Sequence, residues 1–341
     1  MDMWEPKWSV TKKRSYYFNA ATGKSLWTAP AIINTTNLVA EHYNTITTQV
    51  NNDSDTRDNS KQLRAFNNWI KAWLIHTYGQ HKMVLDLACG RGQDINKWTR
   101  VQTPHYIGVD ISTIAITEAK RRAPSQGFKF FCADLAEKPF NFNDFYTHPS
   151  NENPYDAQPR DIVSCMFAFH YFWKTEKMLR CFLVSVISNL KAGGKVLLTF
   201  PNVGVLKHHL TLGTVNNGIR TASNGLFQIT MEEQYWQALP FADTDHAFGW
   251  PYSFTLPGAV DACLEYFVIM PVLEQILREF QLTIVKLAPF QELYHELFAR
   301  SEFIKQIHDM RVLDTNGTIP TLQWECVGLY QALVLEFQPF L

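Results

Sequence analysis

The sequence predicts an α/β fold in which helices cover a mostly parallel, doubly wound β-sheet. Apolar runs typical of buried strands recur at residues 83–87, 105–109, 128–133, 160–167 and 195–200, with helical segments between most of them. Strands that alternate with helices imply a parallel sheet with right-handed crossovers. The chain has 341 residues, 46% of them hydrophobic, so it can bury one large core or one core with a small appendage.

The overall composition argues against several classes of protein. The formal net charge of −1 disfavours a long, non-specific nucleic-acid groove, although a few local cations could hold a short anionic ligand. None of the 6 cysteines belongs to a C-x-x-C pair, so we expect reduced thiols, no disulfide framework and no metal site. No apolar run approaches the ~18 residues that span a bilayer, and no signal peptide is recognisable, so we expect no membrane partner.

The first 30 residues resemble the WW domain, a three-stranded β mini-sheet that grips proline-rich peptides. Trp4 and Trp27 lie 23 residues apart, and the pattern N-x-x-T-x-x-S-x-W-x-x-P runs intact from Asn19 to Pro30. In such domains one aromatic face forms a buckle, here with Tyr17, and the other forms a slot for polyproline II. The resemblance implies a proline-rich peptide as partner; the alternative is that residues 1–30 only dock on the main domain.

Residues 31–60 are expected to form a lid or linker, since residues 45–60 are mostly Asn, Asp, Thr and Ser and have little to bury. A helix is predicted from Ser60 to about Tyr78, and we assign residues 61–341 to one main domain. The apolar positions of that helix recur at helical spacing and would lie on the sheet: Leu63, Phe66, Ile70 and Leu74.

A glycine-bearing loop follows the first strand of the main domain. Strand and loop together, Val84–Asp94, read VLDLACGRGQD, and Asp110 ends the second strand 16 residues further on. In a doubly wound fold such a loop lets a ligand approach the backbone, and the second acidic residue accepts hydrogen bonds from ribose hydroxyls. The glycines do not fit G-x-G-x-x-G, so a ligand with one ribose and no phosphate, S-adenosylmethionine, is favoured over NAD.

The remaining elements are predicted from shorter patterns. Ser112 begins a helix whose last turn is basic. Residues 141–159 and 202–224 are polar and carry Asn and Pro, so we interpret them as surface insertions. The apolar runs 282–285 and 330–335 indicate strands that return antiparallel near the C-terminus.

From about residue 37 to the C-terminus, an ordered series of motifs resembles the mRNA cap guanine-N7 methyltransferases. The matching segments are Val39–Asn44, Leu63–Lys71, the loop after Asp86, Asp134, Phe167–Tyr171, Thr199–Asn202, Glu265–Val268, and Trp324-Glu325 before Tyr330. The resemblance implies a class I (Rossmann-like) S-adenosylmethionine-dependent methyltransferase. Its sheet would be seven-stranded and mostly parallel with an antiparallel C-terminal strand, accompanied here by the small N-terminal β mini-sheet.

The chain departs from the family pattern in two places, the loop at residues 88–93 and position 166. The family loop usually reads G-C-G-K-G-G, whereas Ala88 stands here in place of the first glycine. We expect this alanine to cost little as long as its φ stays negative. The family also tends to place Gln where this chain has Met166, and we expect the sulfur to pack against adenine instead.

The resemblance implies a set of cofactor-binding residues. In it, Lys71 pairs with the methionine carboxylate, Asp110 accepts from the ribose diol and Asp134 accepts from the adenine amine. The full set is Lys71, Asp86, Ala88, Gly90, Asp110, Asp134, Met166 and Tyr171. The alternatives are that Asp110 and Asp134 are turn or helix-cap carboxylates, and that Asp86 and Asp94 chiefly shape the loop.

The resemblance also implies a set of cap-binding residues: Asn67, Asn68, Arg91, Lys97, Arg122, His170, Glu265 and Tyr330. The carboxylate of Glu265 suits the N1–H and N2–H₂ donors of guanine, and the cations suit a triphosphate. The alternatives are a satisfied core histidine at His170 and ordinary solvated charges at Lys97 and Arg122.

No catalytic acid, base or nucleophile is assigned, because guanine N7 carries an exposed lone pair at neutral pH. The predicted reaction is in-line methyl transfer to N7 of GpppN, with Glu265, His170 and Tyr171 most sensitive to substitution.

Two other functions stay open: a methyltransferase for another small acceptor, and an inactive or partner-dependent cap-binding module. We expect the capped RNA end as partner, with other capping-enzyme domains or an activating subunit as further candidates. The expected location is the cytoplasm (host cytoplasm or virion for a viral protein), with the nucleus left open.

Overall fold

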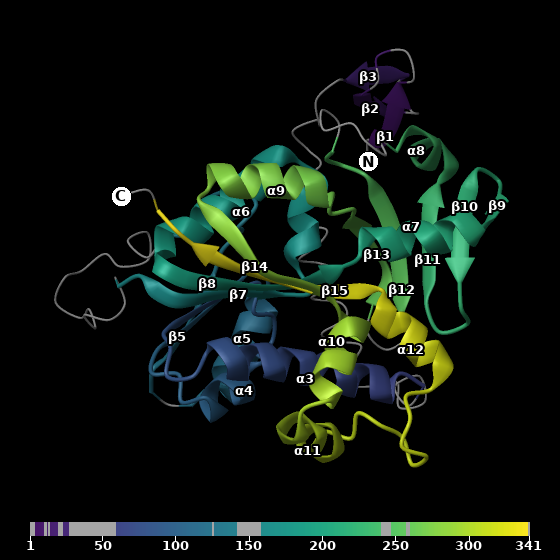
Figure 1. The fold of residues 1–341 in the computed structure, drawn as a ribbon. Helices are drawn as coiled ribbons and strands as arrows, with labels where there is room; N and C mark the ends of the chain where they lie inside the picture. Colours follow the sequence, from purple (N-terminus) through teal and green to yellow (C-terminus); the bar gives the residue numbers. More distant parts are fainter. Residues whose placement is uncertain are drawn as a thin grey trace.

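The computed structural model describes residues 4–9, 12, 14–19, 23–26, 59–124, 126–141, 158–239, 247–256 and 260–339. A seven-stranded sheet forms the centre of the main domain (Figure 1). In spatial order its strands are β14 (Leu282–Pro289), β15 (Tyr330–Phe337), β8 (Leu190–Pro201), β7 (Arg160–Met166), β4 (Val84–Leu87), β5 (Tyr106–Asp110) and β6 (Phe128–Cys132).

Strand directions confirm the predicted fold class. Strands β4 to β8 pair in parallel, and β15 runs antiparallel to β8. Because β14 is antiparallel to β15, it runs in the same direction as the parallel set. The expectation that both C-terminal strands oppose the sheet is therefore wrong for β14 and confirmed for β15.

Helices cover both faces of this sheet. On one face lie α3 (Lys61–Tyr78), α4 (Ile95–Arg100) and α5 (Thr113–Arg122); on the other lie α6 (Glu176–Asn189) and α9 (Met270–Glu279) (Figure 1). Leu63, Phe66, Ile70 and Leu74 of α3 are all fully buried, as the helical spacing predicts. Ser112 caps α5 by accepting from the Ala115 amide at 3.1 Å.

A second, five-stranded sheet lies beside the first and was not predicted. Its order is β13 (Val260–Tyr266), β12 (Pro251–Leu256), β11 (Gln228–Glu232), β10 (Ile219–Ser223) and β9 (Thr214–Asn216), accompanied by α7 (Val203–Leu212) and α8 (Glu233–Ala238). The interpretation of residues 202–224 as a surface insertion is wrong, because they form α7, β9 and β10. Leu206, Leu210 and Ala222 anchor them in a core shared with α3.

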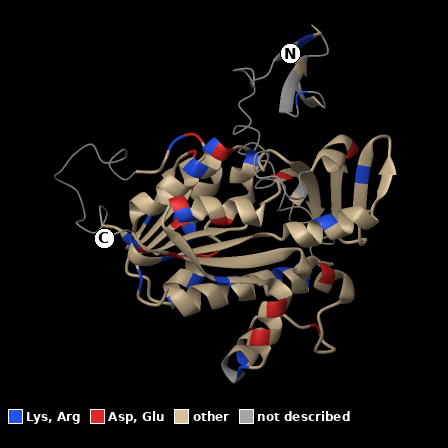
Figure 2. Ribbon diagram, turned by 45° about the horizontal axis from the view of Figure 1, so that its top comes forward, with Lys and Arg blue, Asp and Glu red and all other residues tan. Residues whose placement is uncertain are grey.

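The C-terminal part adds three helices below the sheet edge. These are α10 (Phe290–Phe298), α11 (Ser301–Asp309) and α12 (Thr321–Gly328), and both α11 and α12 contact α3. A 3₁₀ helix, η3 (Phe169–Lys174), follows β7 directly and contacts β13. Among the described helices, none is long and apolar enough to cross a membrane. Basic and acidic residues are interspersed over the described elements (Figure 2), in keeping with the net charge of −1.

Near the N-terminus, β1 (Trp4–Ser9), β2 (Arg14–Asn19) and β3 (Lys24–Leu26) form a three-stranded antiparallel sheet. Trp27 and Pro30 of the WW pattern, residues 31–58 of the predicted lid, and residues 142–157 of the predicted insertion lie outside the described residues. The assignment of a WW domain and the domain boundaries therefore stay predictions.

Candidate active site at the carboxyl edge of the sheet

The carboxyl ends of parallel strands meet at one edge of a sheet, and there the structure gathers most of the predicted cofactor residues. Ala88 follows β4, Asp110 ends β5, Asp134 follows β6 and Met166 ends β7. Because β7, β4, β5 and β6 are neighbours in that order, these residues form a continuous row. Ligands of doubly wound sheets bind in this position.

The loop after β4 turns sharply through left-handed backbone conformations. Ala88, Gly90 and Gly92 have φ values of +57°, +54° and +70°. The expectation of a negative φ at Ala88 is therefore wrong, and the alanine adopts a conformation that costs roughly 1 kcal/mol in an L-residue. A Cβ built on Gly90 would meet no atom within 4 Å, so open space borders the loop at that point.

Asp110 joins this loop to the end of β5. Its Oδ2 accepts from the Gly90 amide at 2.8 Å and its Oδ1 from the Ser112 amide at 2.9 Å. Burial raises the pKa of the carboxyl above its ordinary value. Each carboxylate oxygen has two lone-pair positions, so both can accept one further donor, as a ribose diol requires. Asp134 is less buried, and its Oδ1 accepts from the Ala136 amide at 2.9 Å.

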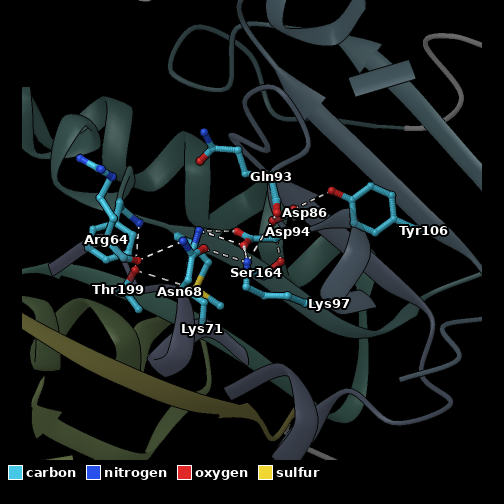
Figure 3. Close-up of polar contacts among 12 residues, drawn as sticks. Arg64, Asn68, Lys71, Asp86, Gln93, Asp94, Lys97, Tyr106, Ser164 and Thr199 are labelled. Carbon is cyan, nitrogen blue, oxygen red and sulfur yellow. Dashed lines mark hydrogen bonds and ion pairs between the residues drawn. The ribbon is translucent and has the colours of Figure 1, made fainter. Parts of the chain in front are cut away.

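A buried charge cluster connects α3 to the loop (Figure 3). Lys71 Nζ lies 2.9 Å from the Asp94 carboxylate, and Lys97 Nζ lies 2.6 Å from it. Lys97 also donates to Asn68 Oδ1 at 2.9 Å. Burial would raise the pKa of Asp94, but the two ammonium groups lower it to about 2. Two cations face one anion in a site where Lys71 is only 7% exposed, so the cluster favours an additional anion.

Asp86 lies in β4 just before this loop and is held by side chains of the two neighbouring strands. Its carboxylate accepts from Tyr106 Oη at 2.6 Å and from Ser164 Oγ at 2.7 Å (Figure 3). Burial, followed by the charge of Asp94, raises its pKa to about 7. These contacts fit the interpretation of Asp86 as a loop-shaping group better than a direct cofactor contact. Tyr106 and Ser164 were missed, although Ser164 lies opposite Asp86 in the β4–β7 register.

The end of β7 carries a second left-handed residue. Phe167 has a φ of +60°, and its amide donates to both the backbone oxygen and Oγ1 of Thr199, each at 2.9 Å. Thr199 Oγ1 in turn lies 3.8 Å from Met166 Sδ. The Phe167 ring packs edge-on against Tyr330 at 5.1 Å between centroids and lies 5.8 Å from Lys71 Nζ. Phe167 therefore lies between predicted cofactor-binding and cap-binding residues.

A small hollow beside Tyr330, with about 150 Å³ of empty space that includes open solvent, contains two predicted cap residues. Its lining is Pro201, Leu206, Tyr252, Phe254, Glu265, Leu329 and Tyr330. Glu265 is 5% exposed, and Tyr252 Oη donates to its Oε2 at 2.6 Å. His170 Nε2 lies 3.4 Å from the other carboxylate oxygen. In the described part of the chain neither ring nitrogen of this buried histidine has a hydrogen-bond partner, which argues against a satisfied core histidine.

The other predicted cap residues are distributed around the charge cluster. Asn67 and Asn68 lie on α3 one turn before Lys71, and Asn67 Oδ1 is buried with no hydrogen-bond partner within the described ranges. Arg91 lies partly buried in the loop. Arg122 occupies the last turn of α5, where its Nε donates to Glu118 on the same helix at 2.7 Å. No contact links Arg122 to the Lys71–Asp94–Lys97 cluster among the described residues, so its role stays a prediction.

Comparison with known proteins agrees with this arrangement. Residues 28–338 match the family model described as the mRNA (guanine-N(7))-methyltransferase domain. The mRNA cap guanine-N(7) methyltransferase 1 of Oryza sativa subsp. japonica is 32% identical over 316 residues, covering 87% of this chain and 80% of that protein. The mRNA cap guanine-N(7) methyltransferase of Schizosaccharomyces pombe is 28% identical over 283 residues, covering 81% and 75%. The chain therefore belongs to the mRNA (guanine-N(7))-methyltransferase family, whose enzymes methylate the mRNA cap with S-adenosylmethionine as methyl donor.

Proposed function

We propose that this protein transfers the methyl group of S-adenosylmethionine to N7 of the guanine cap, GpppN, by in-line attack without a general base. The observation that carries the proposal is the buried Glu265 carboxylate, which lies in a largely apolar pocket next to His170 and close to the ligand edge of the sheet. A buried carboxylate needs donors, and guanine offers them at N1 and N2 whereas adenine does not.

On the donor side, S-adenosylmethionine supplies an electrophilic methyl group on a sulfonium. The residues around the sheet edge fit its three polar regions. The Lys71–Asp94–Lys97 cluster has a surplus positive charge for the methionine carboxylate, and Asp110 has free lone pairs for the ribose diol. Asp134 follows the neighbouring strand and accepts from the adenine amine, while Met166 packs against the ring. The amides after Ala88 assist Lys71.

On the acceptor side, the guanine edge faces Glu265 and His170. Tyr252 occupies one lone pair of Oε2, and His170 Nε2 lies 3.4 Å from Oε1, so the remaining lone pairs of the two oxygens accept from the two guanine donors. His170 offers a ring nitrogen that no described protein group engages. Arg91, Lys97 and Arg122, with Asn67 and Asn68, contact the triphosphate bridge in this proposal.

The rate of methyl transfer comes from holding N7 in line with the methyl group, because N7 needs no deprotonation. As the methyl group moves, positive charge passes from sulfur to the guanine ring. The Glu265 carboxylate and the aromatic rings of Tyr171 and Tyr330 stabilise that charge. The buried pocket also keeps water from the reacting atoms, which strengthens these interactions.

The test is methyl transfer from labelled S-adenosylmethionine to GpppA and to GpppG-capped RNA, with ApppA and uncapped RNA as controls. We expect label on guanine N7 of the G-capped substrates alone. A Glu265→Gln variant, which keeps the shape but loses the charge, should bind the methyl donor normally and transfer poorly. Cap binding without transfer would favour a regulatory or partner-dependent module, and label on another acceptor would favour a different methyltransferase.

For the N-terminal sheet, the proposal is a WW-type unit over residues 1–30 that binds a proline-rich peptide, joined by a lid at residues 31–60 to a main domain over residues 61–341. The antiparallel order of β1, β2 and β3 supports it. A fluorescent proline-rich decapeptide should bind the wild type but not a Trp27→Ala variant; equal binding would contradict the assignment.

Further partners in this proposal are other capping domains or an activating subunit. The 6 free thiols support a reducing, cytoplasmic location, which fluorescence microscopy of the tagged protein tests.

A further inference from the structure

Strand β13 supplies two buried residues to the same side of the second sheet. Cys263 and Glu265 are each 5% exposed, whereas Leu264 between them is 52% exposed. This alternation follows from the two-residue period of a strand. Both buried side chains meet η3, the short helix that follows β7: Glu265 lies 3.4 Å from His170, and Cys263 Sγ lies 3.3 Å from Tyr171 Oη.

Two consecutive residues of η3, His170 and Tyr171, thus contact two alternate residues of β13, Glu265 and Cys263. The Tyr171 and His170 rings also contact each other, with centroids 4.2 Å apart. Burial raises the pKa of Cys263 to about 11, so the group facing the phenol is a neutral thiol. A thiol and a phenol can each donate or accept, so the contact forms with either atom as donor.

We propose that Cys263 is a positioning residue for the transfer reaction. Its thiol fixes the direction of the Tyr171 hydroxyl and docks η3, which extends from the methyl-donor end of β7, onto the strand that holds Glu265. The contact therefore sets the alignment between the donor and the guanine. This inference rests on the proposed function, because it assigns Tyr171 a place beside the transferred methyl group. Cys263 itself touches neither substrate.

The experiment is a double-mutant cycle on the full chain, with Cys263→Ala, Tyr171→Phe and the double variant. We expect Cys263→Ala to lower kcat by about fivefold, the scale of one modest hydrogen bond, with KM for both substrates within about twofold. In the Tyr171→Phe background the same change should have no further effect. Cys263→Ser, which keeps a hydroxyl for the phenol, should restore most of kcat. Cys181→Ala on α6 is the matched control for removal of a buried thiol, and its kcat should equal that of the wild type.

Urea unfolding of the four proteins gives a readout that needs no activity. A stability coupling between positions 263 and 171 would support the contact even if the wild type methylated no cap, which separates this inference from the proposed function. Equal losses of kcat in both backgrounds, equal defects in Cys263→Ala and Cys263→Ser, or zero coupling in unfolding would each overturn it.

Discussion

At the scale of single residues, the backbone at Ala88 is the clearest departure from what its residue type prefers. A φ of +57° lies in the left-handed region, which favours glycine over alanine. We expect Ala88→Gly to raise the free energy of unfolding by about 0.5–1 kcal/mol, after the greater flexibility of glycine in the unfolded chain is subtracted. Urea unfolding measures this. Ala119→Gly, inside α5, is the control and should lower stability by about 1 kcal/mol; a loss at both positions would contradict the strain at Ala88.

Substitution of Glu265 should impair catalysis with the cap substrate, whereas substitution of Lys71 should impair cofactor binding. We expect Glu265→Ala to lose at least ~100-fold in kcat/KM for GpppA while the affinity for S-adenosylmethionine stays within about twofold, because in the proposed site guanine is the one substrate group that the carboxylate binds. Lys71→Ala should weaken S-adenosylmethionine binding by tenfold or more, because the methionine carboxylate loses its cation. Isothermal titration and initial-rate kinetics separate the two effects. If Glu265→Ala lost cofactor affinity instead, its assigned role would be refuted.

Asp86 makes stability depend on pH in a predictable direction. Its folded-state pKa of about 7 lies above the ordinary value of 3.8, so between these values the folded state binds more protons than the unfolded state. Its contribution is fully present below about pH 4 and is lost as pH rises through about 7. Asp86→Asn should therefore flatten the fall in unfolding free energy between pH 4 and pH 7. Unfolding at pH 5 and pH 8 tests this, and an unchanged slope would show that Asp86 does not cause it.

At the scale of elements, the β12–β13 pairing places Tyr252 directly opposite Glu265. The phenol therefore satisfies the buried carboxylate from the neighbouring strand at 2.6 Å. We expect Tyr252→Phe to lower kcat/KM for GpppA by about tenfold, because Glu265 loses a donor and a fixed direction. KM for S-adenosylmethionine should not change, since Tyr252 lies in the second sheet. Steady-state kinetics with each substrate varied tests this; a changed cofactor KM alone would contradict it.

Sequence patterns predict elements that have a local signal, but they do not predict contacts that depend on strand pairing. Apolar runs predicted β4 to β8, and helical spacing predicted α3, because those signals are local. Local patterns do not predict the second sheet, because its strands are short and half-exposed. The hairpin signal Asn217-Gly218 lies within a polar stretch that is equally typical of a surface loop. Partners such as Tyr252 for Glu265 and Ser164 for Asp86 depend on strand register across 13 and 78 residues. Local sequence does not determine strand register. The resemblance to a family implies roles for single residues, but it does not identify the residues that contact them.

At the scale of the whole molecule, the proposed site lies between two sheets that share one core. Residues of α3, the second sheet and the C-terminal helices belong to a single buried cluster, so ligands on either side act on one folding unit. In the proposed site, the methyl donor lies on the seven-stranded sheet with α3, and the guanine lies beside β12 and β13, where α7 and the adjoining ends of β8 and β15 complete the lining. Binding at either side should therefore stabilise the entire main domain.

Ligand-induced stabilisation tests this arrangement without any turnover. S-adenosylhomocysteine at 100 times its Kd should raise the unfolding free energy by about 2.7 kcal/mol, because it binds the folded state alone. The increment should persist in Glu265→Ala and should fall to about 1.4 kcal/mol or less in Lys71→Ala at the same concentration, as a tenfold or greater loss of affinity requires. GpppA should stabilise the wild type and Lys71→Ala but not Glu265→Ala. Thermal or urea unfolding with each ligand provides the four comparisons. If both ligands failed with the same variant, the donor and acceptor sides would not be separable, and the division of the site between the two sheets would be wrong.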